Sequence, residues 1–209
     1  MHSDHFFVVP ETRTWEQVID KSRFIGIATP VANSQEIEDA FQAVREQYPN
    51  ARHYVYAYRL KEGLLERASD DGEPQGTGGR PILDVLQHKQ IWNVLVIVVR
   101  YFGGILLGTG GLTRAYGSTA REVLELAPLK MLQPFVVFQL KISYAWYDQL
   151  RYHLSQRGWE TGKETFLEFI ELEVYIPLAE AEGFGKWLTE LTAGQVAWER
   201  DAEVWRPGN

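Results

Sequence analysis

The stretch WNVLVIVVRYFGGILLGTGGLTRAYG (residues 92–117) joins an apolar run to a glycine-rich turn and then to a helical pattern. Residues 92–102 are nearly continuously apolar and rich in β-branched side chains, which is typical of a strand buried on both faces. One stripe at helical spacing follows the glycines and consists of Leu112, Ala115, Tyr116, Thr119, Val123 and Leu126. The stretch therefore predicts a central strand that leads through a tight turn into a helix.

The sequence before this stretch alternates between strand and helix patterns. We expect strands at residues 22–30 and 52–60, with a helix at 33–50 between them. Asn33 and Glu36 have the spacing of a capping box at the start of that helix. A long loop at 68–81 and a short helix at 82–89 then lead to the central strand.

The sequence after Pro134 shows a different order of elements. Residues 135–144 predict a strand, 146–158 a helix, 159–177 two strands, 178–194 a helix and 195–205 a last strand. This order, β-α-β-β-α-β, is that of a ferredoxin-like α+β sandwich. Residues 127–134 have the character of a linker, so we expect two domains, 1–133 and 134–209.

Composition limits the classes of function. The 209 residues carry 21 Lys and Arg against 28 Asp and Glu, a net charge of −7, so any nucleic-acid site must be a local patch. Residues 1–133 hold 14 basic and 16 acidic residues, net −2, and residues 134–209 hold 7 and 12, net −5. The absence of cysteine excludes disulfides and thiol catalysis. A polar N-terminus and the lack of a long apolar run predict a cytoplasmic protein without a membrane partner.

The second glycine cluster has the parts of an anion site. Gly108, Gly110 and Gly111 precede a predicted helix, where backbone N–H groups and the helix dipole favour negative charge, and Arg114 lies in the first helical turn. Neither this cluster nor the GTGGRP run at 76–81 completes a Walker or dinucleotide pattern. On the motif alone, close backbone packing therefore ranks ahead of anion binding.

The SDDGEP run (residues 69–74) places three acids within four residues. Asp70, Asp71 and Glu73 suit either a Mg²⁺ site or a general base. The structural reading, a turn around Gly72 with an ion pair to Arg100, ranks above a metal. The tyrosines of strand 52–60 suit RNA stacking, although packing is the more common role of such residues.

Three blocks, KSRFIG (21–26), SDDGEPQGTGGRPILDVL (69–86) and NVLVIVVRYFGGILLGTGGLTRAYG (93–117), together resemble the IMPACT family of the bacterial YigZ type. The resemblance implies an N-terminal α+β domain like the second domain of ribosomal protein S-five. It also implies a C-terminal domain similar to the last domains of elongation factor G. Eukaryotic members regulate translation, which suggests contact with RNA or the ribosome, whereas fold likeness alone establishes no function. The resemblance transfers no catalytic residue.

The main hypothesis is a binding protein that regulates translation through a cleft for RNA, the ribosome or another anion, with neither cofactor nor metal. A protein partner from the translation machinery fits the same resemblance. The candidate binding residues are Asp70, Asp71, Gly72, Glu73, Arg80, Arg100, Gly108, Gly110, Gly111 and Arg114. The alternative is an enzyme of phosphoryl transfer or hydrolysis that holds a metal with the SDDGE carboxylates. A third hypothesis is a protein-interaction module with an apolar patch on the second sheet.

Overall fold

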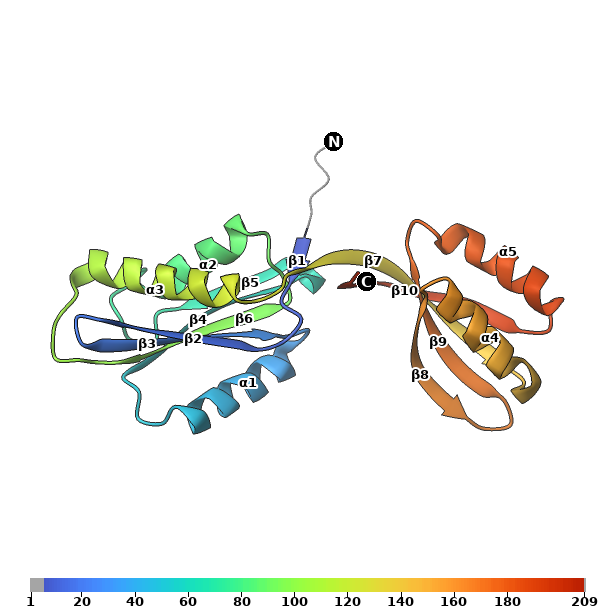
Figure 1. Cartoon of the computed structure of the whole chain (residues 1–209), viewed down its shortest axis with the longest axis horizontal. Coiled ribbons are helices and arrows are strands. Elements are labelled where there is room, and N and C mark those ends of the chain that lie inside the picture. Colours follow the sequence, from blue (N-terminus) through green and yellow to red (C-terminus); the bar gives the residue numbers. More distant parts are fainter. Residues whose placement is uncertain (1–5, 209) are drawn as a thin grey trace. The chain divides into compact units, whose positions relative to one another are not determined.

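The computed structural model describes residues 6–208, and the chain divides into two compact units, Met1–Leu132 and Gln133–Asn209 (Figure 1). Each unit has its own sheet, helices and apolar core. The expected α+β class with two domains is confirmed. None of the described helices has the length and apolarity needed to cross a membrane.

The first unit is built on a five-stranded antiparallel sheet in the order β2-β3-β6-β4-β5. Its strands are β2 (Arg13–Ile19), β3 (Ser22–Pro30), β4 (His53–Leu60), β5 (Leu65–Ser69) and β6 (Val94–Tyr101), with a 3-10 turn at Glu62–Leu64 before β5. The apolar run of the opening stretch is β6, the central strand, which is buried along almost its whole length. Its position explains why the run shows no polar alternation.

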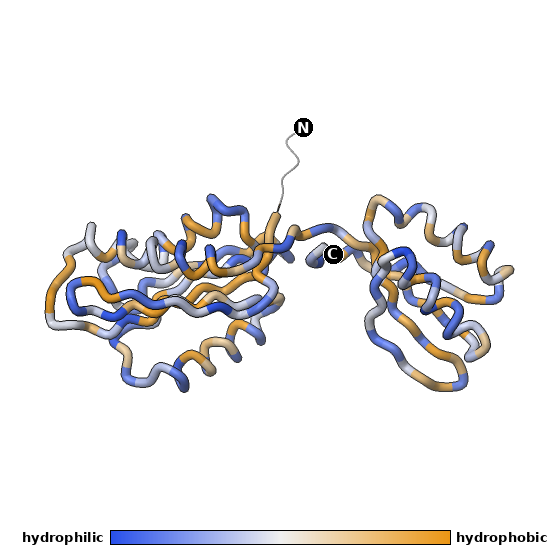
Figure 2. The backbone as a smooth tube through the Cα atoms, viewed as in Figure 1, coloured by the Kyte–Doolittle hydropathy of each residue, from blue (hydrophilic) through white to orange (hydrophobic). Residues whose placement is uncertain are grey.

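Helices cover both faces of this sheet (Figure 1). Helix α1 (Ser34–Gln47) packs on one face with the tyrosines of β4, while α2 (Gly79–His88) and α3 (Gly108–Glu125) pack on the other. The expected capping box forms at α1, because the Asn33 side chain accepts the Glu36 N–H at 3.0 Å. Figure 2 shows the apolar residues concentrated along the strands of this sheet.

Several elements differ from the sequence predictions. Helix α2 begins three residues before the predicted 82, and α3 includes the glycines instead of following them. The short strand β1 (Phe6–Val8), β2 and β5 were not predicted, because such edge strands are short or half exposed. The predicted linker at 127–134 is partly strand, since β7 (Lys130–Ile142) begins within it and pairs with β1.

The second unit confirms the ferredoxin-like order. Strand β7 is followed by α4 (Tyr144–Gln156), β8 (Glu160–Phe166), β9 (Ile170–Pro177), α5 (Ala181–Thr192) and β10 (Ala197–Pro207). The sheet has the order β1-β7-β9-β8, and β10 also pairs with β7. Both helices pack on one sheet face through a core that includes Phe138, Leu172 and Phe184.

Candidate anion-binding site

The first glycine loop is filled by a carboxylate of the protein itself. Asp70 accepts hydrogen bonds from the N–H groups of Gly76 at 2.7 Å and of Gly78 and Gly79 at 2.9 Å. Burial acts to raise the pKa of Asp70, but the three amide bonds lower it, and its net pKa lies below the ordinary value. These amides, at the N-terminus of α2, are therefore not open to an external anion.

Other glycines are required by close packing. A Cβ at Gly79 would lie 2.6 Å from the backbone nitrogen of Ser69, and a Cβ at Gly103 would overlap the backbone of Lys21. Gly72 has a φ of +85°, which a turn of this kind requires. The packing interpretation of the sequence holds at these positions.

A buried network surrounds Glu73. Its carboxylate lies 2.5 Å from Arg100 Nη1 and accepts the Tyr116 hydroxyl at 2.8 Å, and His53 Nε2 lies 3.7 Å away. The side chains of Glu73 and Arg100 are 4% and 6% exposed, so each charge depends on the other. Burial and the neighbouring Glu73 raise the pKa of Tyr116 far above its usual range. The predicted ion pair from the SDDGE turn to Arg100 is present, and the Arg100 Nε has no partner among residues 6–208.

Asp71, the remaining acid of the turn, also has partners within the protein. The Asp71 carboxylate accepts the Tyr54 N–H at 2.6 Å, and its carbonyl accepts His53 Nδ1–H at 2.7 Å. The three acids thus point to different protein groups. No set of three or more His, Asp or Glu within residues 6–208 could hold a metal ion. Within this part of the chain, these carboxylates therefore do not form the metal site that the alternative enzyme hypothesis requires.

In the part of the chain that the structure describes, the second glycine cluster, at the start of α3, has no carboxylate on its backbone N–H groups, whereas Asp70 binds those of the first. Helix α3 has no side-chain cap and no acid in its first turn. Within residues 6–208, no acceptor pairs with the N–H groups of Gly108, Thr109 or Gly110. Arg114 lies back along the helix, and its Nη1 is 3.6 Å from the position that a Cβ would take at Gly110. A guanidinium and the positive end of a helix dipole are thus close together without a negative charge.

A pocket of about 450 Å³ lies at this helix end. Gly108 and Thr109 form one wall, and Arg52, His53 and Arg100 bring cationic or titratable groups to it. The connection from β6 to α3, residues 102–107, adds an apolar wall, on which Phe102 is 48% and Leu106 is 87% exposed. Glu73 also lines the pocket and pairs with Arg100, so Arg52 and the α3 amides are the groups there that could meet an anion, next to an exposed apolar surface.

Part of this pocket could not be predicted from the sequence. Arg52, His53, Phe102 and Leu106 were not candidates, because only the register of β4 on β6 places His53 opposite Arg100. The strand pattern at 52–60 predicted a strand but not its neighbour in the sheet.

The single cleft expected from sequence is not what the structure shows. Arg80 is exposed and pairs with Asp84 at 2.7 Å on its own helix. Arg114 lines a separate groove between α2 and α3, and neither Gly110 nor Gly111 lines the pocket, since Gly111 packs on Leu107. Helix geometry is the reason, because residues near each other in sequence face different directions around a helix.

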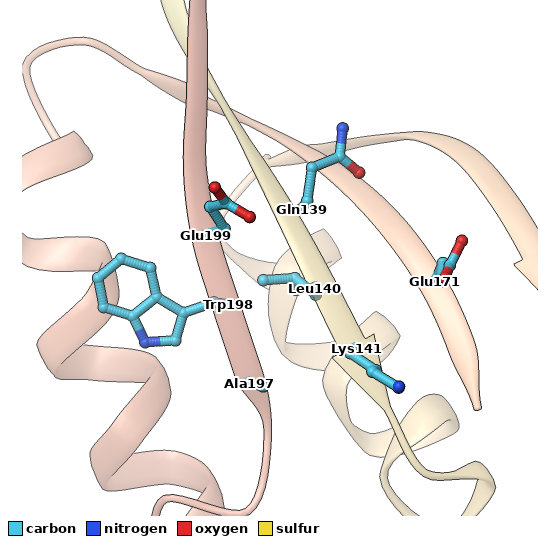
Figure 3. Close-up of a pocket in the computed structure, with 7 residues that line it drawn as sticks. All are labelled: Gln139, Leu140, Lys141, Glu171, Ala197, Trp198 and Glu199. Carbon is cyan, nitrogen blue, oxygen red and sulfur yellow. The ribbon is translucent and has the colours of Figure 1, made fainter.

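Two other surfaces suggested by the sequence lie elsewhere in the protein. The tyrosines of β4 belong to the cluster covered by α1, where Tyr56 meets Phe41 at 4.7 Å between ring centroids. On the second sheet, a pocket of about 420 Å³ is lined by polar and apolar residues, as Figure 3 shows: Gln139, Leu140, Lys141, Glu171, Ala197, Trp198 and Glu199. Trp198 is 42% exposed, so the surface mixes charged groups with an exposed aromatic ring, and the protein-interaction module remains a prediction.

Comparison with known proteins identifies the class. Residues 20–124 match the Impact N-terminal domain, and residues 140–195 match a domain of unknown function, DUF1949. The chain therefore belongs to the IMPACT family, as the three sequence blocks predicted.

The relatives include bacterial and eukaryotic members. The IMPACT family member YvyE of Bacillus subtilis is 36% identical, covering 93% of this chain and 89% of the relative. YigZ of Escherichia coli is 33% identical over 85% of this chain and 89% of its own length. Human Protein IMPACT is 33% identical over 49% of this chain and 37% of its own length.

A solved structure described as "Crystal structure of an hypothetical protein" has a TM-score of 0.70 and 28% identity, and the match covers 95% of this chain and 98% of that one. Membership of the family supports a translation-related function in general terms.

Proposed function

We propose that this protein binds RNA at the N-terminal turn of α3 and acts through that contact in translation. The observation that carries the proposal is the contrast between the two glycine loops. Asp70 fills the α2 loop, whereas the α3 turn leaves three N–H groups open next to Arg114. An anion at the α3 turn would gain both the amides and the guanidinium.

The chemistry of the surrounding wall favours RNA over a small phosphate compound. Arg52 is exposed, and no carboxylate in residues 6–208 pairs with it. The exposed ring of Phe102 offers a surface on which a base can stack, and Leu106 extends this apolar surface beyond the pocket. Phosphate contacts plus a stacking ring are the usual composition of a single-strand site.

Fluorescence anisotropy with a labelled single-stranded 12-nucleotide RNA tests the proposal. We expect the affinity to fall as salt rises, with a slope in log–log form of about −0.7 for each phosphate contact. Arg52→Ala and Arg114→Ala should each weaken binding and make the slope shallower by about 0.7. Arg67→Ala is the matched control, because Arg67 is exposed on the edge strand β5 and has no ion pair among residues 6–208.

Competition in the same assay shows whether the site binds the phosphates of RNA or those of a small compound. The proposal is supported if unlabelled RNA or purified ribosomes compete with the labelled RNA at concentrations where inorganic phosphate and adenosine monophosphate do not. Equal competition by the small compounds would instead assign the site to a metabolite. Binding that ignores salt, or that falls equally in the Arg67→Ala control, would refute the proposed role of the α3 turn.

A further inference from the structure

The groove between α2 and α3 is a second positively charged feature of the first unit. It has a volume of about 510 Å³, and Arg114, Arg121 and His88 line it. The two helices come close at Gly117, where a Cβ would lie 3.7 Å from Pro81. Small residues such as Gly117 and Ser118 therefore line the groove together with these cationic groups.

The charges in this groove are not neutralised by the protein. Asp84, the acid that lines it, is already paired with Arg80 at 2.7 Å. Within residues 6–208, no carboxylate lies within ion-pair distance of Arg114 or Arg121. The opposite side of the same unit is acidic, because α1 carries Glu36, Glu38, Asp39 and Glu46 against Arg45. Helix α1 is thus acidic, whereas the α2–α3 groove presents Arg114 and Arg121; Glu122 and Glu125 also lie on α3 but do not line the groove.

The spacing of the groove residues follows one line along α3. Arg114, Gly117 and Arg121, which line the groove, fall at i, i+3 and i+7, which is one face of a helix. At a rise of about 1.5 Å per residue, Arg114 and Arg121 are about 10 Å apart along the axis. Gly108 and Arg121 are about 20 Å apart by the same measure. Thr109 lines the pocket and Thr113, one turn farther along α3, lines the groove and donates to the Thr109 carbonyl at 3.0 Å, so the two adjoin along the helix next to Arg114.

We infer that a single RNA strand runs from the pocket at the start of α3 into the α2–α3 groove, with Arg114 contacting a phosphate at the junction and Arg121 contacting one farther along. This inference rests on the proposed function and adds the path and length of the bound segment. A stacked strand advances about 3.4 Å per nucleotide, so about 20 Å corresponds to about six nucleotides. Arg121 is a contact that only a strand of that length reaches.

A length series of oligouridylates, from two to ten nucleotides, tests this path at fixed salt. We expect the wild-type affinity to rise steeply up to about six nucleotides and then to level off. Arg121→Ala should bind the dinucleotide and trinucleotide as wild type does, and should bind the hexanucleotide severalfold more weakly. Its salt slope with the hexanucleotide should be shallower by about 0.7. Alanine suits a helix, so the fold is retained, and Arg67→Ala again serves as the charge-matched control.

Each outcome has a separate meaning. If RNA binding depends on Arg52 but Arg121→Ala changes nothing at any length, the path is wrong and the proposed function stands. If Arg121→Ala weakens the dinucleotide and the hexanucleotide equally, the path is also wrong, because Arg121 would not act at the far end. If the wild-type protein binds no RNA of any length, both proposals fail. A polyglutamate peptide of equal charge that binds more tightly than the hexanucleotide would assign the groove to a protein partner.

Discussion

Replacement of Gly110 by aspartate separates stability from anion binding. Gly110 is the third residue of α3, and its added Cβ would meet Arg114 Nη1 at 3.6 Å, an ordinary van der Waals contact. A side chain in place of glycine in a helix stabilises it by up to about 1 kcal/mol. An acid in the first turn adds about 0.3–1 kcal/mol through the helix dipole, and a pair with Arg114 adds about 0.2–0.5 kcal/mol.

The expected net gain for Gly110→Asp is about 1 kcal/mol in the free energy of unfolding. For a unit of this size, that corresponds to a rise of about 3 °C in Tm. The same carboxylate places a negative charge where the proposed RNA phosphate would lie and occupies Arg114. We therefore expect the RNA affinity to fall by about tenfold or more, equivalent to at least about 1.4 kcal/mol.

Thermal unfolding and RNA anisotropy on the same samples give both readouts. Gly110→Ala is the matched control, because it should raise Tm similarly while leaving RNA affinity near the wild-type value. A Gly110→Asp protein that is more stable and binds RNA unchanged would refute the anion site at α3. Equal loss of binding in Gly110→Ala would show that the cause is steric.

Three further substitutions, and a fourth as a control, test the structural contacts by urea denaturation. Asp70→Asn should cost about 1–3 kcal/mol at neutral pH. The pKa of Asp70 is lower in the folded protein than in the unfolded chain, so this stabilisation is present above about pH 4 and is lost as pH falls through the folded pKa. The unfolding free energies of wild type and variant should therefore converge in acid. A difference that stays constant with pH would contradict this. Glu73→Ala should cost about 3–5 kcal/mol, because it leaves Arg100 charged and buried, and a cost below 1 kcal/mol would disprove the dependence. Gly103→Ala should cost about 3 kcal/mol or more, because the added Cβ would overlap the backbone of Lys21. Gly183→Ala is the control and should stabilise slightly, because Gly183 lies in α5 with open space around it. Similar effects of the two substitutions would argue against the close approach of Gly103 to Lys21.

Much of the fold follows from local sequence signals. The strand predicted at 22–30 is β3 with the same bounds, because its apolar residues end at a proline. The helix α1 follows from its apolar stripe and the Asn33–Glu36 cap, which forms as expected. Edge strand β2 was missed because its side chains alternate between half buried and exposed, so its hydrophobic pattern is weak.

The candidate site depended more on contacts between distant residues. The pairing of Glu73 with Arg100 could be anticipated, since a charge beside a buried strand needs a partner. The capture of three amides by Asp70 could not, because it depends on how the loop folds back on its own carboxylate. The register of the strands places Arg52 and His53 at the pocket. Arg80 does not line the pocket, because it lies on another face of its helix, where it pairs with Asp84.

The opposed charges of α1 and of the α2–α3 groove have a kinetic consequence. At about 0.01 M ionic strength the Debye length is about 30 Å, so an approaching polyanion experiences the net charge of −7 and is repelled before contact. At about 0.15 M the length is about 8 Å, and the nearest arginines dominate. The association rate constant for RNA should therefore first increase as salt is added to a very dilute buffer, while the lifetime of the complex shortens throughout.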